Sequence, residues 1–515
     1  MVTPPSHPNV VGGRGDRFPV GLVVCSVIVS IAVRARFIWT PLSSDEGGYL
    51  AVERAWASGK SLYTDAWVDR PQGLLLLFRG WDRLTGGSPE AIRVMAILFG
   101  CIAVVGVAYA VFALAGRRAA WVAAILVAVA SSNARIEGFT ANGELLAGAV
   151  AAAGVAAACA YLFGGRRPYW LLVSGVLAGC AVSLKQSGFD GFLAVLVCVV
   201  AGGFTGERRW RQVLREGALC IAGLAAVLAA LLLHGLLLGF SAWWYAIAGY
   251  RISGLNASDA DWHRFGITSR IAAPTILPLI AVAILGVLVW LARDRRVARA
   301  TVLLPAWVCF AALAFVTGGL FHRHYWVTLT FPLAAAAAVA IAPRSRRLDG
   351  RMLIAVMCLV VAPSIVSTAR VIKLDRSAAA VLANDDPRLI VDERVGQWYD
   401  DHRTADSTFY ALCASAGVYA SADAIPPYPY LWLDGVQHGK DAQTKLVELF
   451  AGDDPPTYVA VYQSALLCNP SGQVDTMLDQ RYIKQGQVDG AVILELRDHV
   501  PGDQLSARRA FPTAT

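Results

Sequence analysis

Long apolar runs, separated by short polar segments, fill the first 370 residues of the chain. A helix needs about 20 mainly apolar residues to cross the roughly 30 Å hydrocarbon core of a bilayer. Runs of this kind predict about eleven transmembrane helices, near residues 18–36, 91–114, 119–133, 143–163, 169–184, 188–204, 217–240, 271–292, 300–318, 324–342 and 351–369. No small-residue cleavage site follows the first run, so we expect a retained anchor. The pattern predicts a polytopic, all-α membrane domain over residues 1–370.

Two stretches break this pattern. The first, residues 37–90, is long and mixed in character, and within it 47–58 and 71–85 are typical of short amphipathic helices on a membrane surface. The second begins near residue 371, where charged residues become frequent. There the segments 407–412, 457–462 and 491–496 have the composition of strands, and helix-like stretches such as 442–452 lie between them. We expect a small α/β domain over residues 371–515.

The loops between the apolar runs alternate in charge. Every second loop is basic, and the basic clusters are Arg117 and Arg118; Arg166 and Arg167; Arg208, Arg209, Arg211 and Arg215; Arg293, Arg295, Arg296 and Arg299; and Arg344, Arg346, Arg347 and Arg351. Basic loops stay in the cytoplasm, so these loops and the N-terminus are expected there. An odd number of helices then places the C-terminal domain outside, with the protein in the plasma (inner) membrane of a bacterium.

Composition supports a bilayer rather than a large aqueous core. The chain has 515 residues, 56% of them hydrophobic and 16% charged, with a mean hydropathy of +0.52. Soluble domains carry about a quarter charged residues. The net charge of +8 comes from residues that cluster between apolar runs, which is typical of membrane topology. We therefore expect the lipid bilayer, and no nucleic acid, as a partner.

Eight of the ten cysteines lie inside apolar runs, where cysteine behaves as a small hydrophobic residue. Only Cys413 and Cys468 fall in the polar C-terminal region. If that region is outside the cytoplasm, the two can form a disulfide, and the alternative is a pair of buried free thiols.

Two arginines at the outer end of the first run oppose the charge rule. Arg34 and Arg36 either extend toward the interface to reach water, or bind an anion beside the first outer loop. The residues alone leave both alternatives open.

Further ionisable and amide side chains share the outer side of the predicted topology. They are Asp45, Glu46, Asp69, Arg70, Asn142, Glu144, Lys185, Gln186, Arg251, His322, Arg323 and His324. Polar residues at the ends of membrane helices are costly unless they are solvated or paired, so they are functional candidates. Positive charge that is kept outside against the usual bias indicates an anionic ligand at this interface.

Acid and cations together fit one reaction. A carboxylate can act as general base on an acceptor hydroxyl, and Lys or Arg can stabilise a departing phosphate. A sugar carried on a polyprenyl phosphate presents its phosphate at this depth. The alternative for Asp45 and Glu46 is a helix N-cap, because Ser43 and Ser44 precede them.

These motifs resemble the GT-C superfamily of membrane glycosyltransferases. The resemblance rests on the acidic motif at Asp45–Tyr49 after the first helix, GKSLY ending at Tyr63, DRPQG at 69–73, and the segments EGFTANGELL, SLKQSG and HRHYWVTLTFP. The branch they resemble most is the bacterial form of the protein O-mannosyltransferase and lipid A aminoarabinose transferase group, glycosyltransferase family 39. The resemblance implies the GT-C fold and covers nearly the whole chain, most firmly up to residue 340.

The resemblance also implies roles for residues. The first-loop acid is the catalytic base in that family, which corresponds to Asp45, with Glu46 as helper or substitute. Later outer-loop cations bind the lipid phosphate, and the matching positions here are Lys185, Arg251, Arg323 and His324. The remaining candidates for substrate contacts are Tyr49, Arg70, Asn142, Glu144 and Gln186.

The first loop departs from the family pattern in one place. Aminoarabinose transferases carry Lys-Pro-Pro where this chain has Arg70-Pro71-Gln72, so the donor or the acceptor is expected to differ. No cofactor is certain. Some relatives use a divalent cation near the first-loop acids, and the sequence leaves metal dependence open.

The chain is therefore predicted to transfer a sugar, with inversion, from a polyprenyl-phosphate donor to an extracytoplasmic glycan, lipid or protein. A membrane transporter or lipid flippase is the alternative, although such proteins tend to have internal repeats and polar sites at the membrane midplane. A membrane sensor that uses its outer domain to bind ligands is a second alternative, and it predicts that Asp45 and Lys185 are dispensable.

Overall fold

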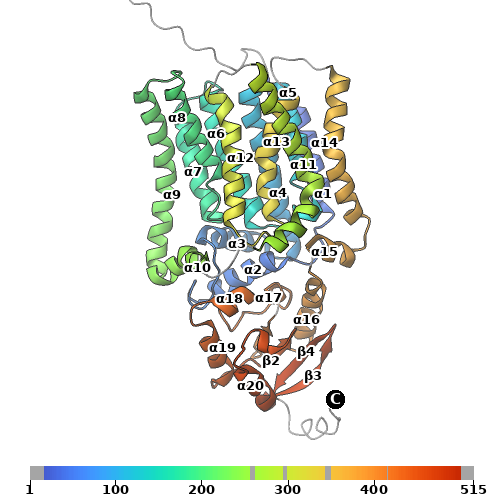
Figure 1. The fold of residues 1–515 in the computed structure, drawn as a ribbon. Helices are drawn as coiled ribbons and strands as arrows, with labels where there is room; N and C mark the ends of the chain where they lie inside the picture. Colours follow the sequence, from blue (N-terminus) through green and yellow to red (C-terminus); the bar gives the residue numbers. More distant parts are fainter. Residues whose placement is uncertain are drawn as a thin grey trace, which may run out of the picture.

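The computed structural model of the chain describes residues 17–255, 261–293, 298–342, 349–384, 386–413 and 416–499. Figure 1 shows a bundle of long, roughly parallel helices with a smaller domain at one end, and this smaller domain contains the sheet.

Each predicted apolar run corresponds to one helix of the bundle. The helices are α1 (Val20–Ala35), α4 (Pro89–Ala115), α5 (Arg117–Ala130), α6 (Gly143–Leu162), α7 (Tyr169–Leu184), α8 (Asp190–Phe204), α9 (Trp210–Trp244), α11 (Trp262–Arg293), α12 (Arg299–Thr317), α13 (Tyr325–Ile341) and α14 (Gly350–Ile372). Among the described residues, α4, α6, α9, α11, α12 and α14 are long and apolar enough to cross a membrane, and α1, α7, α8 and α13 are shorter apolar helices. The chain is a multi-pass membrane protein.

Helix α6 lies inside the bundle and α9 lies at its edge. Nearly all side chains of α6 are buried, whereas α9 exposes large apolar residues such as Leu233 and Leu237. Lipid rather than water surrounds such a helix, so this exposure is not costly. At Gly239 the backbone adopts φ 101°, a conformation that favours glycine, and the helix bends. The π-helix η2 (Tyr245–Gly249) and α10 (Tyr250–Leu255) then follow at the end of the bundle (Figure 1).

Helices are present at both predicted stretches of the first outer loop, as α2 (Ser44–Ala57) and α3 (Gln72–Thr85). Most of α2 is buried, so it is a packed helix rather than an amphipathic one on a surface. The two helices lie between the bundle and the C-terminal domain (Figure 1). Ser43 caps α2, and the capping box is completed by the side chain of Glu46, which binds the Ser43 backbone N–H. This local sequence therefore starts the helix at the residue before Asp45.

The C-terminal region folds into helices around a four-stranded sheet. Helices α15 (Arg376–Asn384) and α16 (Arg388–His402) lead from α14 into it, and the further short helices are α17 (Val418–Ser421), α18 (Leu433–His438), α19 (Ala442–Ala451) and α20 (Gln473–Arg481). The strands are β1 (Phe409–Leu412), β2 (Tyr458–Val461), β3 (Tyr482–Val488) and β4 (Ala491–Leu496), in the order β1-β2-β4-β3. Strands β1 and β2 are parallel, and the other pairs are antiparallel. The expected small α/β domain is present.

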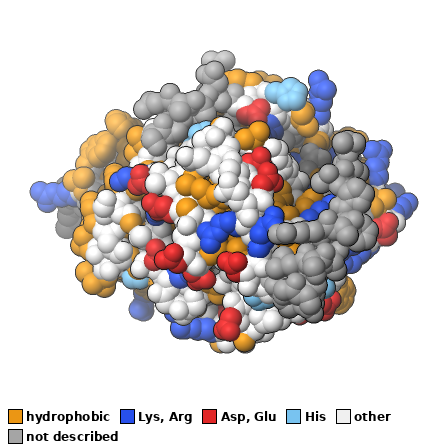
Figure 2. Space-filling model, turned by 90° about the horizontal axis from the view of Figure 1, so that it is seen from below, with side chains coloured by type: hydrophobic (Ala, Val, Ile, Leu, Met, Phe, Trp, Pro, Cys, Tyr) orange, Lys and Arg blue, Asp and Glu red, His pale blue; other side chains and the backbone are white. Residues whose placement is uncertain are grey.

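The C-terminal domain contains a disulfide bond, and its surface carries charges of both signs (Figure 2). Cys413, at the end of β1, forms a disulfide with Cys468. Seen from the side of the C-terminal domain, the described surface carries Lys and Arg side chains interspersed with Asp and Glu (Figure 2). This view shows no large surface of one charge.

Two consecutive glycines let the C-terminal domain approach α2 closely. A Cβ atom on Gly47 would lie 2.6 Å from Gly417 Cα, and one on Gly48 would lie 2.4 Å from Trp432 Cζ2. Both distances are far below van der Waals contact, so only glycine fits at these positions. The Gly47-Gly48 pair therefore allows Trp432, just before α18, to pack beside the first turn of the helix that carries Asp45.

Substituting Gly48→Ala is expected to lower the free energy of unfolding by about 1–3 kcal/mol, because the methyl group overpacks against the Trp432 ring. The measurement is thermal unfolding of the purified protein in detergent. Gly80→Ala in α3 is the matched control, since a Cβ there meets nothing within 4 Å, and it should be neutral or slightly stabilising. Equal stability of the two variants would contradict the close packing at Gly48.

Candidate functional site

A cavity of about 810 Å³ lies between the end of the bundle and the C-terminal domain. Its walls come from the first outer loop, the turn before α6, α10, the start of α11, the loop before α13, and two stretches of the C-terminal domain. Of the predicted site residues, the cavity is lined by Asp45, Tyr49, Arg70, Asn142, Arg251, Arg323 and His324. The others, Glu46, Glu144, Lys185 and Gln186, lie outside its lining.

Asp45 presents its carboxylate to this cavity from the first turn of α2. One oxygen, Oδ2, accepts a hydrogen bond from the Tyr49 hydroxyl at 3.1 Å, and Oδ1 accepts one from Trp432 Nε1 at 3.2 Å. The side chain is 23% exposed. Two donors thus orient the carboxylate, while part of it stays open to a ligand.

Glu46, one residue later, has a different environment. Its side chain is fully buried, and Arg93 forms an ion pair with it at 2.8 Å. The Ser43 and Ala141 backbone N–H groups donate to the same carboxylate at 3.0 and 2.7 Å. These contacts occupy both oxygens, so Glu46 holds α2, α4 and the turn before α6 together.

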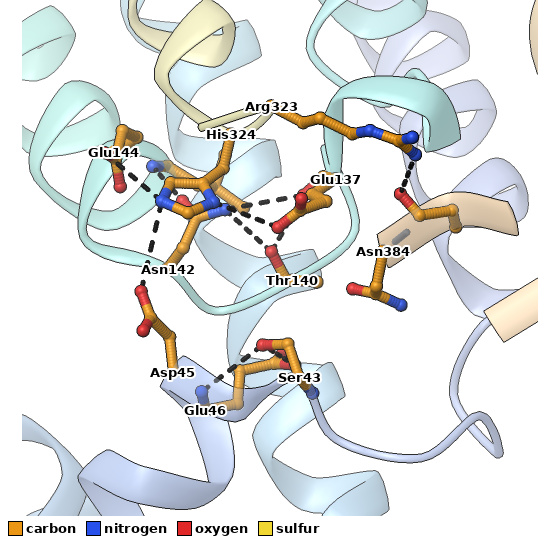
Figure 3. A network of polar contacts seen from close by, with 12 residues as sticks. Ser43, Asp45, Glu46, Glu137, Thr140, Asn142, Glu144, Arg323, His324 and Asn384 are labelled. Atoms are coloured by element: carbon orange, nitrogen blue, oxygen red, sulfur yellow. Dashed lines mark hydrogen bonds and ion pairs between the residues drawn. The ribbon is translucent and has the colours of Figure 1, made fainter. Parts of the chain in front are cut away.

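His324 lies among three carboxylates (Figure 3). Its Nδ1 is 3.0 Å from Glu137 Oε2, and its Nε2 is 3.7 Å from Glu144 Oε1 and 4.0 Å from Asp45 Oδ2. Burial lowers the pKa of the imidazole, but the carboxylates outweigh burial and raise the pKa to about 9. His324 is therefore an imidazolium at neutral pH.

A second histidine, His322, stacks on His324. The two rings are almost parallel, with centroids 5.4 Å apart, and His322 also lines the cavity. Burial and the charge on His324 hold the pKa of His322 well below its usual value. One ring of the pair is thus charged and the other neutral.

A divalent cation does not fit among these acids as the side chains lie. Within the described ranges, no group of three His, Cys, Asp or Glu side chains is placed to hold a metal ion. The imidazolium of His324 already occupies the position between Asp45, Glu137 and Glu144.

Three of the predicted residues lie behind the cavity wall and support it: Lys185, Glu144 and Gln186. Lys185 pairs with Glu144 and lies 4.4 Å from the ring centroid of Tyr325, and burial lowers the pKa of this lysine despite Glu144. Gln186 Nε2 donates to the backbone oxygens of Asp69 and Ile247, at 2.9 and 3.2 Å. These bonds connect the short loop after α7 to the first outer loop and to η2.

Asn142 has a similar supporting role, although it lines the cavity. It is the N-cap of α6: its side-chain oxygen accepts from Leu145 N at 2.9 Å, and its amide donates to the Thr140 hydroxyl at 2.7 Å. Both side-chain groups are thus used within the turn that carries Glu137.

The first outer loop and α10 contribute paired charges to the cavity. Asp69 forms ion pairs with Arg251 and, at 2.6 Å, with Arg70. Burial alone would raise the pKa of Asp69, but the two arginines outweigh it and lower the pKa. Arg70 Nε also donates to the Tyr49 hydroxyl at 3.2 Å. A continuous chain of contacts thus connects Arg251 to Asp45.

Arg323 turns away from Asp45. Its Nη1 donates to the Leu382 backbone oxygen at 2.8 Å, so it attaches the loop before α13 to α15 (Figure 3).

Arg264, at the start of α11, is a cavity residue that the sequence did not indicate. It pairs with Asp261 at 3.3 Å, and 42% of its side chain is exposed.

Neither alternative proposed for Arg34 is correct. Its guanidinium is buried and donates to the backbone oxygens of Gly138 and Ser131, both at 2.8 Å, and to three serine hydroxyls. It neither reaches water nor faces the cavity. Arg36 donates to the Leu374 backbone oxygen at 2.8 Å. Arg34 thus stabilises the turn that carries Glu137, and Arg36 stabilises the turn after α14.

The sequence contained few signs of the other cavity residues. Glu137 lies in the segment EGFTANGELL, and its backbone is left-handed, with φ 56°. Trp432 and Asp434 come from the C-terminal domain, and no pattern in that part of the chain connects them with the first loop. Only the packing of the two domains brings them to Asp45.

The comparisons with solved structures identify proteins of the same architecture. ArnT from Cupriavidus metallidurans, solved bound to undecaprenyl phosphate, matches with a TM-score of 0.61 and 13% identity over 92% of this chain and 98% of that one. The oligosaccharyltransferase of Archaeoglobus fulgidus in its apo form matches with a TM-score of 0.55 and 11% identity over 86% and 69%. The arabinofuranosyltransferase AftD from Mycobacteria matches with a TM-score of 0.51 and 15% identity over 93% and 42%. No protein-family model and no curated protein matches the sequence.

The charge on His324 predicts a pH dependence of stability. Its pKa is raised from 6.5 to about 9, so its stabilising contribution is complete below pH 6.5 and is lost as the pH rises through 9. The thermal unfolding midpoint in detergent should therefore fall between pH 6.5 and 9.5, and fall less in His324→Gln. His402→Gln, an exposed histidine of α16, is the control and should behave as the wild type. The same pH dependence in His324→Gln would contradict the imidazolium.

Proposed function

Because this chain has the GT-C fold, we propose that it is a glycosyltransferase that moves a sugar from a polyprenyl-phosphate donor to an extracytoplasmic acceptor, with inversion. The observation that carries the proposal is the carboxylate of Asp45. It is the group of the acidic pair that faces the cavity, and two hydrogen-bond donors orient it there. ArnT, which has the same fold, was solved with undecaprenyl phosphate, and this supports the donor class.

Asp45 acts as the general base in this proposal. The acceptor oxygen attacks the anomeric carbon on the face opposite the phosphate, and a new C–O bond forms as the bond to the phosphate oxygen breaks. The bonding electrons leave with the phosphate, and the hydroxyl proton moves to Asp45. A single displacement of this kind inverts the anomeric configuration. Tyr49 and Trp432 hold the carboxylate in position.

Arg70 and Arg251 are the cations that we assign to the leaving phosphate. Both line the cavity, and both form ion pairs with Asp69, which holds them side by side. Guanidinium groups bind phosphate oxygens in a bidentate manner and stabilise the charge that develops there. Lys185 adds positive charge from behind the wall, and His324 adds it from beside Asp45. Arg323 instead holds the loop that carries His324.

We further propose that the protein lies in the plasma membrane of a bacterium, with the cavity and the C-terminal domain on the outer side. The basic loops between α4 and α5, α6 and α7, and α8 and α9 all lie at the end of the bundle opposite the C-terminal domain (Figure 1). The positive-inside rule assigns that end to the cytoplasm. We place the boundary between the membrane domain and the C-terminal domain near residue 370, and the end of α14 at Ile372 supports this.

Reporter fusions test this orientation. Alkaline phosphatase fused to the C-terminus should be active, because its disulfides form only outside the cytoplasm. Green fluorescent protein at the same position should not fluoresce. Fusions that end in the loop at 205–209 should show the reverse pattern. Phosphatase activity at 205–209 rather than at the C-terminus would contradict the proposed orientation.

Asp45→Asn is expected to reduce sugar transfer at least 100-fold, since a general base contributes about 10²–10⁴ in rate. The measurement is transfer of labelled sugar from polyprenyl-phosphate donors by purified protein, with an extracted acceptor pool. Asparagine retains the shape of the side chain, so the thermal stability should change little.

Glu46→Gln is the matched comparison. It removes the charge that faces the buried Arg93, so we expect a loss of stability of about 3 kcal/mol or more. The turnover of the protein that remains folded should stay near that of the wild type. If Asp45→Asn is fully active while Glu46→Gln is folded but inactive, the base is Glu46. Absence of transfer from every donor would favour the transporter alternative.

A further inference from the structure

We propose that the acceptor bound in this cavity is an uncharged glycan, and that Trp432, Trp67, Tyr250 and Asp434 form its binding subsite. This inference rests on the proposed glycosyl transfer and specifies its acceptor. The four residues come from the first outer loop, α10 and the C-terminal domain, and all of them line the cavity. The C-terminal domain is therefore part of the acceptor site rather than a separate module.

Aromatic rings form the wall beside Asp45. The ring of Trp432 lies 5.8 Å from that of Tyr49, and the ring of Trp67 lies 4.8 Å from that of Tyr250 in an edge-to-face arrangement. The rings of Tyr49, Trp67 and Tyr250 are almost fully buried, and that of Trp432 is partly exposed. Sugar rings have apolar C–H faces and hydroxyl edges, so a sugar can stack on the exposed part of the Trp432 ring. Such a wall fits a glycan better than it fits a charged lipid headgroup.

Trp432 also connects this wall to the chemistry. Its indole N–H donates to Asp45 Oδ1 at 3.2 Å, so a sugar stacked on the indole has its hydroxyls near the proposed base. Asp434, two residues later, accepts a hydrogen bond from the Tyr250 hydroxyl and is 58% exposed. Its other oxygen lies 3.2 Å from His438 Nδ1. The lone pairs that these two contacts leave can bind the hydroxyls of a stacked sugar.

The charge balance of the cavity favours an uncharged acceptor. Five arginines and six carboxylates line it, and the imidazolium of His324 brings the two signs to equality. A donor phosphate uses the positive charge of Arg70 and Arg251. The lining then has no excess of positive charge for a second, anionic ligand.

The described wall of the cavity offers no strand of the sheet for a peptide to pair with. One common way to bind an extended peptide is to pair it with the edge of a sheet. In the described part of the cavity lining, every residue comes from a helix, a helix end or a loop, and none comes from β1, β2, β3 or β4. The volume of about 810 Å³ is in the range of a pocket for a small ligand, such as a sugar donor headgroup with the end of a glycan chain.

The test is an acceptor panel with the purified full-length protein and labelled polyprenyl-phosphate sugars. The acceptors are neutral oligosaccharides of two to four residues, the same oligosaccharides on a lipid anchor, and peptides that contain serine and threonine. Transfer to oligosaccharide, free or lipid-anchored, is the expected result, and the two arms identify the source of the glycan. Transfer to peptides alone would overturn this inference and leave the proposed function intact. Absence of sugar release from every donor with every acceptor would instead overturn the proposed function.

Variants of Trp432 test the subsite itself. Trp432→Ala should raise the KM for the oligosaccharide at least tenfold and lower kcat, because it removes both the ring and the indole N–H. Trp432→Phe retains a ring, so its KM should stay within about threefold of the wild type while kcat falls. Trp210→Ala, an exposed tryptophan at the other end of the bundle, controls for loss of a large side chain and should change neither constant. An unchanged KM in folded Trp432→Ala would contradict the glycan subsite.

Discussion

The buried carboxylate of Glu46 is the contact on which the folding of the site depends most. It caps the helix that carries Asp45, pairs with Arg93 of α4, and accepts a hydrogen bond from the backbone of Ala141. A buried carboxylate is stable only if such donors surround it, so this side chain requires three separate segments to meet at one point. The result is that Asp45, one residue earlier, faces the cavity at a fixed angle. The two acids of the pair thus divide structural and chemical roles between them.

Buried polar side chains fix the other walls in a similar way. Arg34 stabilises the turn that carries Glu137, Glu137 orients His324, and Gln186 connects the first outer loop to η2. Arg34 and Gln186 donate to backbone oxygens of loops, and Glu137 and His324 contact each other through their side chains. These contacts connect the walls of the cavity to one another, as a site requires if a base and a leaving group are to be held in line.

Much of the fold could be predicted because the bilayer imposes a strong pattern. Eleven apolar runs correspond to eleven helices, and the amphipathic stretches correspond to α2 and α3. Strand β3 was not predicted, since its residues are mostly polar and it lies at the sheet edge. One signal for it was present: Asp489 and Gly490, between β3 and β4, both have positive φ, and Asp-Gly is a typical hairpin turn.

The candidate site was only partly predictable. Topology placed Asp45, Arg70, Arg251 and His324 on one side, and the structure brings them to one cavity. Topology could not show which acid of the pair faces that cavity, because adjacent helical residues point in directions about 100° apart. Nor could it show that Lys185 pairs with Glu144 behind the wall, or that Trp432 reaches Asp45 across the domain boundary. Those contacts depend on packing between segments that no local pattern connects.

The most direct measurement of the central claim is the anomeric configuration of the product, determined by NMR after reaction with a polyprenyl-phosphate sugar of known configuration. Single displacement with Asp45 as base predicts a product of inverted configuration, formed together with free polyprenyl phosphate. A product of retained configuration would contradict the mechanism, because it requires a second displacement on the enzyme. Unreacted donor, with the acceptor bound, would contradict glycosyl transfer itself.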